Sequence, residues 1–175
     1  MFILIRAVVY ATAFVGLLLV FVPAQLLTWA DIPRPVNIRA PQIAGIVAST
    51  LGGILAVWCI GTFVVAGKGT PAPFDPPARL VVTGPYRYMR NPMYFGAALA
   101  IAGAALFYQS PLLLAYASVF LLFSHFFVVF YEEPAMERMF GEEYEAYRRQ
   151  VGRWGPPASI RRPSGARPKA VGRRP

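Results

Sequence analysis

Four apolar stretches, separated by polar and proline-rich segments, divide the chain. A helix needs about 20 consecutive apolar residues to cross the hydrocarbon core of a bilayer. The pattern therefore predicts an all-α, polytopic membrane protein. The expected transmembrane helices cover about residues 2–27, 42–66, 93–108 and 112–131.

The first stretch carries one charge, Arg6, and begins with apolar residues 1–5. A secretory signal peptide would place its positive charge ahead of a shorter apolar core. We therefore interpret the stretch as a transmembrane helix, with Arg6 reaching toward the interface.

Small residues mark one face of the second helix. Gly45, Ser49 and Gly53 recur every four residues. Because residues four apart lie on the same helix face, we expect a neighbouring backbone to approach closely there.

The third helix is short. At 1.5 Å per residue its 16 residues reach about 24 Å. Pro92 falls at or near its first turn, where a missing amide hydrogen is harmless. Residues 109–111 form a tight break, so the third and fourth helices are expected to form a hairpin.

The chain changes from apolar to highly charged after residue 131. We expect Glu132, Glu133 and Pro134 to end or kink the apolar helix. Residues 142–151 then form a predicted amphipathic helix with Tyr144 and Tyr147 on one face. The expected organisation is one membrane domain over residues 1–155, with a proline-rich surface loop at 67–82 and a basic, disordered tail at 156–175.

Composition supports a membrane protein. The chain is 57% hydrophobic and 14% charged, whereas a soluble domain carries about 25% charged residues. The net charge is +9, and ten of the 17 basic residues lie from Arg138 onward. The positive-inside rule then places both termini in the cytoplasm. We expect anionic lipid headgroups, and not nucleic acid, as the partner of this charge.

Cys59 is the only cysteine and lies within an apolar stretch. A single cysteine forms neither an internal disulfide nor a zinc cluster. We expect a small buried hydrophobic side chain and no metal site.

Two polar clusters follow from the predicted topology. Since the hairpin returns the chain to its starting side, both clusters face the same surface. Charged groups there are often only headgroup anchors. A pair of carboxylates opposite arginines also suits a zwitterionic ligand with an amino acid end. The clusters are Tyr86, Arg87, Tyr88, Arg90, Asn91 and Tyr94, and Glu132, Glu133, Tyr144, Tyr147 and Arg148.

The segments GPYRYMRNPMYFG and YEEPAMERMFGEEYEAYRRQVGRW closely resemble the isoprenylcysteine carboxyl methyltransferase family, which is grouped with the phospholipid N-methyltransferases. The resemblance covers residues 67–154. Many carboxyl methyltransferases of the family have His where this chain has Asn91, and the phospholipid N-methyltransferases are more similar there. The resemblance therefore leaves the acceptor open.

The resemblance implies S-adenosylmethionine as the cofactor, bound by these two segments. Arg90 or Arg148 is expected to pair with its carboxylate, and Glu132 or Glu133 with its ammonium or ribose. The catalytic residues are expected to be Arg90, Asn91 and Glu132. The expected cofactor site comprises Tyr86, Arg87, Tyr88, Arg90, Asn91, Pro92, Tyr94, Gly96, Glu132, Glu133, Tyr144, Tyr147 and Arg148.

His125, the only histidine, lies seven residues before Glu132 and so faces the same way from deeper in the membrane. Two interpretations remain: a buried histidine hydrogen-bonded between helices, or a contact to the substrate.

The expected function is methyl transfer from S-adenosylmethionine to a lipophilic substrate at the cytoplasmic membrane face, similar to isoprenylcysteine carboxyl O-methyltransferases. A phospholipid N-methyltransferase is the alternative. Two further alternatives are an NADPH-dependent protein similar to the sterol reductases, which are generally much longer, and a non-catalytic membrane scaffold. The sequence indicates no oligomeric state.

Overall fold

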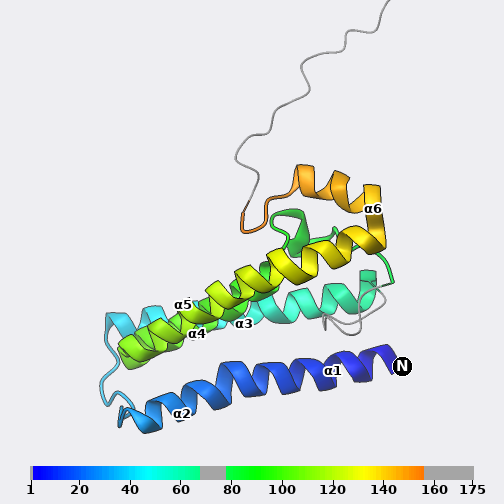
Figure 1. The fold of residues 1–175 in the computed structure, drawn as a ribbon. Helices are drawn as coiled ribbons and strands as arrows, with labels where there is room; N and C mark the ends of the chain where they lie inside the picture. Colours follow the sequence, from blue (N-terminus) through cyan, green and yellow to red (C-terminus); the bar gives the residue numbers. More distant parts are fainter. Residues whose placement is uncertain (1, 68–77, 156–175) are drawn as a thin grey trace, which may run out of the picture.

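The computed structural model describes residues 2–67 and 78–155, which are mainly helical and contain no strand. Figure 1 shows a long N-terminal rod lying beside a bundle of three helices, with a further helix folded over one end. The elements are α1 (Phe2–Val15), the π-helical η1 (Gly16–Phe21), α2 (Val22–Trp29), α3 (Ala40–Thr62), the π-helical η2 (Phe63–Gly67), the 3₁₀ turn η3 (Gly84–Arg87), α4 (Pro92–Tyr108), α5 (Pro111–Phe127), the π-helical η4 (Val128–Glu132) and α6 (Glu133–Gln150).

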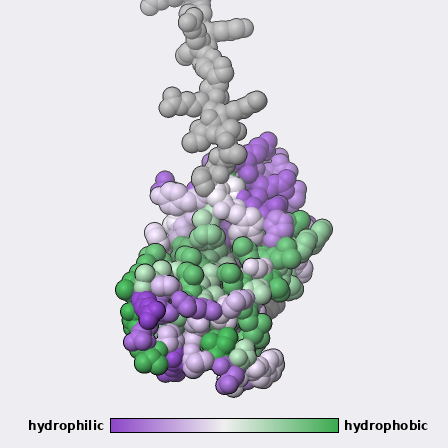
Figure 2. Space-filling model, turned by 90° about the vertical axis from the view of Figure 1, so that its left-hand side faces the viewer, coloured by the Kyte–Doolittle hydropathy of each residue, from purple (hydrophilic) through white to green (hydrophobic). Residues whose placement is uncertain are grey.

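Three helical stretches are long and apolar enough to cross a membrane: Thr12–Trp29, Ala40–Gly67 and Pro111–Gln150. The 17-residue helix Pro92–Tyr108 is apolar but shorter. The all-α membrane fold is therefore confirmed. In Figure 2 hydrophobic residues form a band across the middle of the face shown, and hydrophilic residues gather at the top, the height at which α6 lies in Figure 1, and at the lower left.

The helix does not end at residues 132–134, where an end or a kink was expected. It continues through the π-helical η4, directly before Pro134, into α6, and proline and π-helical segments can bend a helix without ending it. The break lies at Gly141, whose φ is 49°, a left-handed conformation that glycine adopts without steric cost. Eight of the 18 residues of α6 are charged, so we place it outside the apolar core. The expected tail (156–175) and most of the 67–82 loop lie outside the described residues.

Helices α3 and α4 pack through backbone contacts. A Cβ atom on Gly45 would lie 2.6 Å from the carbonyl oxygen of Gly103. The Ser49 hydroxyl donates a hydrogen bond of 3.0 Å to the carbonyl of Ala100. Gly52 makes the third close contact, with Gly96. Gly53, which was expected here, makes no such contact, because a Cβ atom on it would meet nothing within 4 Å. At 3.6 residues per turn, Gly52 lies seven residues after Gly45 and stays near the same face of α3. Gly53, eight residues after Gly45, is rotated further from that face.

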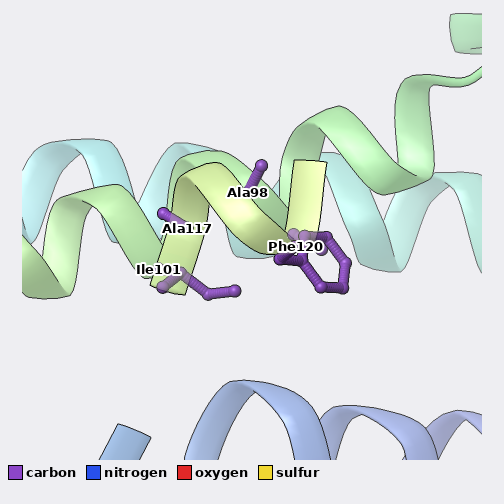
Figure 3. Packing of buried hydrophobic residues seen from close by; sticks show 5 residues of the cluster. Ala98, Ile101, Ala117 and Phe120 are labelled. Carbon is purple, nitrogen blue, oxygen red and sulfur yellow. The ribbon is translucent and has the colours of Figure 1, made fainter. Parts of the chain in front are cut away.

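The hairpin between α4 and α5 forms as expected. Gln109 ends α4 with a φ of 50°, and the Ser110 side chain caps α5 by accepting a hydrogen bond of 3.2 Å from the amide of Leu113. Figure 3 shows Ile101 of α4 and Phe120 of α5 on the side of these helices that faces the N-terminal rod. The buried cluster comprises Ala97, Ala98, Ile101, Ala117 and Phe120.

The N-terminal rod packs sparsely on the bundle. Only 6% of Thr12–Trp29 is buried. Leu18 and Leu19 touch the core cluster of α4 and α5. The Tyr116 hydroxyl of α5 donates a hydrogen bond of 2.9 Å to the carbonyl of Leu18. The rod also contacts the bundle on either side of η1, through α2 against α5 and through α1 against η2.

Candidate functional site

The two polar clusters of the sequence meet where α4 begins and α6 folds over the bundle. The Tyr147 hydroxyl donates a hydrogen bond of 2.7 Å to the carbonyl of Tyr86. The amide of Arg90 donates one of 2.9 Å to the carbonyl of Gly152. The face formed by Tyr144, Tyr147 and Val151 is buried, as the amphipathic pattern predicts. Segments about 60 residues apart thus form one structural unit.

Glu133 is the centre of an ion-pair network. Arg153 binds it in bidentate fashion, with Nε 2.6 Å from Oε1 and Nη2 2.9 Å from Oε2. Arg90 Nη1 lies 3.1 Å from the same Oε1 and 3.1 Å from the hydroxyl of Tyr144. Burial raises the pKa of Glu133, but the hydrogen bonds from Arg153 and the charges of Arg90, Arg153 and Arg148 outweigh burial and hold the pKa below its ordinary value of 4.5. Both carboxylate oxygens of Glu133 thus have arginine partners within the protein.

Arg153 is a residue of this network that sequence reasoning missed. It lies after α6, at the end of the segment that resembles the family, but it was not among the residues expected at the site. The same segment is held by Asn91, whose buried side-chain amide donates a hydrogen bond of 3.2 Å to the carbonyl of Arg153. Asn91 therefore fastens the end of the domain against the start of α4.

A small cavity of about 60 Å³ lies inside this unit. Eight of the predicted site residues line it: Tyr86, Arg90, Asn91, Tyr94, Glu132, Glu133, Tyr144 and Tyr147. The rest of its lining is apolar and was not predicted, namely Phe63, Leu80, Val81, Met93, Val128 and Met136.

Two polar atoms at this cavity lack hydrogen-bond partners. Among the described residues, the buried side-chain atoms left unsatisfied are Arg90 Nε and Glu132 Oε2. The Tyr94 side chain hydrogen-bonds Glu132. Buried polar groups are nearly always paired, so two unpaired ones of opposite charge in one cavity indicate a polar ligand. The phenol of Tyr86 stays protonated, because burial raises its pKa well above the ordinary value.

Other predicted residues lie away from the cavity. Arg87 and Tyr88 are exposed on the surface. The exposed Arg148 pairs with Glu137 at 3.7 Å. Gly96 lies against α3, where a Cβ atom would be 2.8 Å from the carbonyl oxygen of Gly52. The buried Pro92 begins α4.

His125 lies outside this cavity. Its Nδ1 accepts a hydrogen bond of 3.0 Å from Nε1 of Trp154, so its Nε2 carries the proton if the ring is neutral. The bond agrees with the interpretation of a hydrogen-bonded structural histidine. A contact with substrate stays a prediction.

A second, larger cavity of about 670 Å³ lies between the N-terminal rod and helices α3, α4 and α5. Its lining is almost wholly apolar, and its volume falls within the range of roughly 300–1,000 Å³ of small-molecule sites. Met93 and Tyr94 line both cavities. These two side chains therefore form the wall between a polar site and an apolar site.

A comparison with protein families finds a match to the phospholipid methyltransferase family over residues 40–143. The match runs from the start of α3 into α6 and covers more than half of the chain. It includes most of the residues around the polar cavity. No significant match was found among curated proteins or solved structures. The N-terminal rod lies outside the matched region. The chain belongs to the phospholipid methyltransferase family, a family of membrane methyltransferases that act on lipids.

Proposed function

We propose that the protein transfers a methyl group from S-adenosylmethionine to the amine of a lipophilic acceptor at the cytoplasmic membrane face. The observation that carries the proposal is the buried, unpaired oxygen of Glu132 beside the wall that separates the polar cavity from the apolar one. An acceptor with an apolar body in the larger cavity would have its polar end near this carboxylate.

The residues around the polar cavity suit the chemistry of S-adenosylmethionine. The ligand carries a carboxylate, for which the cavity offers the unpaired Nε of Arg90, so that Oε2 of Glu132 stays available to the acceptor. Tyrosine rings at the cavity could contact the adenine or the sulfonium. The cavity of about 60 Å³ admits only part of such a ligand. Binding therefore requires side chains at its mouth to move.

Glu132 is the residue best placed to handle a proton. S-adenosylmethionine supplies an activated methyl group, so the protein's part is alignment of the acceptor and exclusion of water. An ammonium acceptor must first lose a proton, which Glu132 Oε2 can accept. Tyr94 fixes the orientation of this carboxylate through its hydrogen bond. A carboxylate acceptor would instead be repelled by Glu132, and for this reason we favour an amine.

Cofactor binding is the first test. Purified protein in lipid nanodiscs is titrated with S-adenosylmethionine and, separately, with NADPH by calorimetry. We expect heat of binding with the first ligand alone. Binding of NADPH in place of S-adenosylmethionine by folded protein would overturn the proposal in favour of a reductase.

Acceptor chemistry is the second test. Protein with methyl-labelled cofactor is offered phosphatidylethanolamine or an isoprenylated cysteine in matched nanodiscs. We expect label on the amine. Label on the prenylcysteine carboxylate alone would contradict the proposed amine acceptor but would still support a methyltransferase.

A further inference from the structure

The N-terminal rod forms one side of the apolar cavity. Residues of α1 and η1, among them Phe14, Leu17 and Leu18, face residues of α5, among them Val119 and Phe120, across it. The region matched to the family begins at residue 40, so this wall is a feature of the chain beyond the matched segment.

The cavity is elongated along the membrane-spanning direction. Along α5 its lining runs from Tyr116 to Phe127, a distance of roughly 16 Å at 1.5 Å per residue. Its polar end lies at Met93 and Tyr94, because these residues begin α4 and also line the small cavity. Its deep end lies near Tyr116, about one and a half turns into α5 from the opposite end of the bundle.

One side-chain hydrogen bond joins the rod to α5 at the deep end. The Tyr116 hydroxyl donates to the carbonyl of Leu18 at 2.9 Å, and Leu18 lies inside the π-helical η1. Short π-helical segments occur frequently at functional sites. The bond therefore fixes the position of η1 on α5 at this end of the cavity.

We propose that the apolar cavity binds the hydrocarbon chain of the methyl acceptor and that the N-terminal rod, held by Tyr116, determines which chain lengths fit. The inference rests on the proposed function for the identity of the occupant. A hydrocarbon chain suits the site because the lining is apolar, the surroundings are lipid, and the polar end of the cavity adjoins Glu132 through Tyr94. Tyr116 is thus a specificity-determining residue, acting through the position of Leu18.

Photo-cross-linking tests occupancy without turnover. Wild-type protein in nanodiscs is irradiated with a long-chain alkylamine that carries a diazirine at the end of its chain, and the adducts are located by mass spectrometry. We expect adducts concentrated on residues 17–19 and 116–123. Adducts spread equally over the lipid-facing side of α3, at Ile43, Val47 and Ile54, would overturn the chain site whether or not the protein methylates amines.

A matched pair of variants tests chain selection. Val119→Trp fills the cavity from an exposed position, and Leu122→Trp adds the same ring at a similarly exposed position of α5 that does not line it. One methylene in an apolar pocket changes selectivity by about tenfold or more. We expect Val119→Trp to lower kcat/KM for long-chain amines about tenfold relative to short-chain amines, and Leu122→Trp to leave the ratio unchanged. An unchanged ratio in both variants, with methylation intact, would overturn this inference and leave the proposed function standing.

Tyr116→Phe removes only the hydroxyl. A hydrogen bond contributes about 1 kcal/mol, or about fivefold. We expect the preference for the best chain length to fall by about this factor while the Kd for S-adenosylmethionine stays the same. Full retention of chain preference in the folded variant would show that Tyr116 does not set the depth of the site.

Discussion

At the scale of single residues, two adjacent glutamates have opposite environments. Glu133 has both oxygens bound by arginines, whereas Glu132 has one oxygen on the Tyr94 side chain and one with no partner. The sequence presents them only as a pair of carboxylates. The structure distinguishes a residue that holds the unit together from one that is available to a ligand.

Glu132→Gln tests the available carboxylate. The substitution keeps size and hydrogen bonding but removes the proton acceptor, so we expect turnover to fall by about 10²–10⁴. Thermal stability in detergent should change little, because no ion pair is broken. The matched control is Glu137→Gln, which alters an exposed pair with Arg148 and should retain wild-type turnover. Wild-type turnover in Glu132→Gln would assign the proton to another group.

Glu133→Gln tests the structural carboxylate. It leaves Arg90 and Arg153 without their shared partner in a buried site. Removing one partner of such a buried pair costs about 3–5 kcal/mol. We expect a large fall in the free energy of unfolding, measured by denaturant titration in micelles. A loss no greater than that of Glu137→Gln would contradict the role of the network.

The pH dependence of stability follows from the same group. The pKa of Glu133 lies below its ordinary value of 4.5 in the folded protein. Its stabilising contribution is therefore present above pH 4.5 and is lost as the pH falls through the lowered pKa of the folded state. Wild-type unfolding free energy should decrease below about pH 4.5, and the Glu133→Gln variant should show a shallower decrease. Parallel pH profiles for the two proteins would count against this assignment.

The sequence predicts part of the site at this scale. Aromatic and polar residues near the start of α4 and from Glu132 into α6 are recognisable as a cluster, and eight of them line the cavity. The sequence does not show which of these residues face the cavity. Arg148 points outward to Glu137, and Gly96 packs on α3. Arg153 lies in a segment without periodicity, so its contact with Glu133 depends on a backbone path that only the folded chain defines.

At the scale of elements, hydropathy predicts the apolar helices to within a few residues, because lipid requires long apolar segments with internally satisfied backbones. Residues 132–134 were expected to end or kink the helix, and they do not end it. Proline can bend a helix without ending it, and the helix runs through Pro134 directly after the π-helical η4. The conformation that turns the chain belongs to Gly141 instead.

The contact between α3 and α4 yields a prediction with an internal control. A methyl group at Gly52 would collide with the backbone of α4 at Gly96 and Ala100, whereas one at Gly53 would meet nothing. Forcing an extra carbon into a close-packed contact costs about 1–3 kcal/mol. We expect Gly52→Ala to lower the unfolding temperature in detergent and Gly53→Ala to leave it unchanged or slightly raised. Equal effects from the two substitutions would contradict the assigned helix register.

At the scale of the whole molecule, the start of the N-terminal rod and α6 lie at the same end of the bundle (Figure 1). The polar cavity lies at that end, because it is formed by the start of α4 and by α6. Basic residues are concentrated in the segments expected on this side, and only Arg34 and Arg39 lie in the connection between the first two helices. The asymmetry favours a cytoplasmic site.

Cysteine labelling determines this orientation directly. Cys59 is fully buried, so new cysteines can be added without replacing it. Val36→Cys lies in the connection between α2 and α3, where Val36 is 94% exposed, and Glu143→Cys lies on the exposed side of α6. We expect a membrane-impermeant maleimide to label Val36→Cys in intact cells and Glu143→Cys only after lysis. The reverse pattern would place the carboxylates and arginines of the site outside the cell, where the charge bias of the loops gives no reason for them to be.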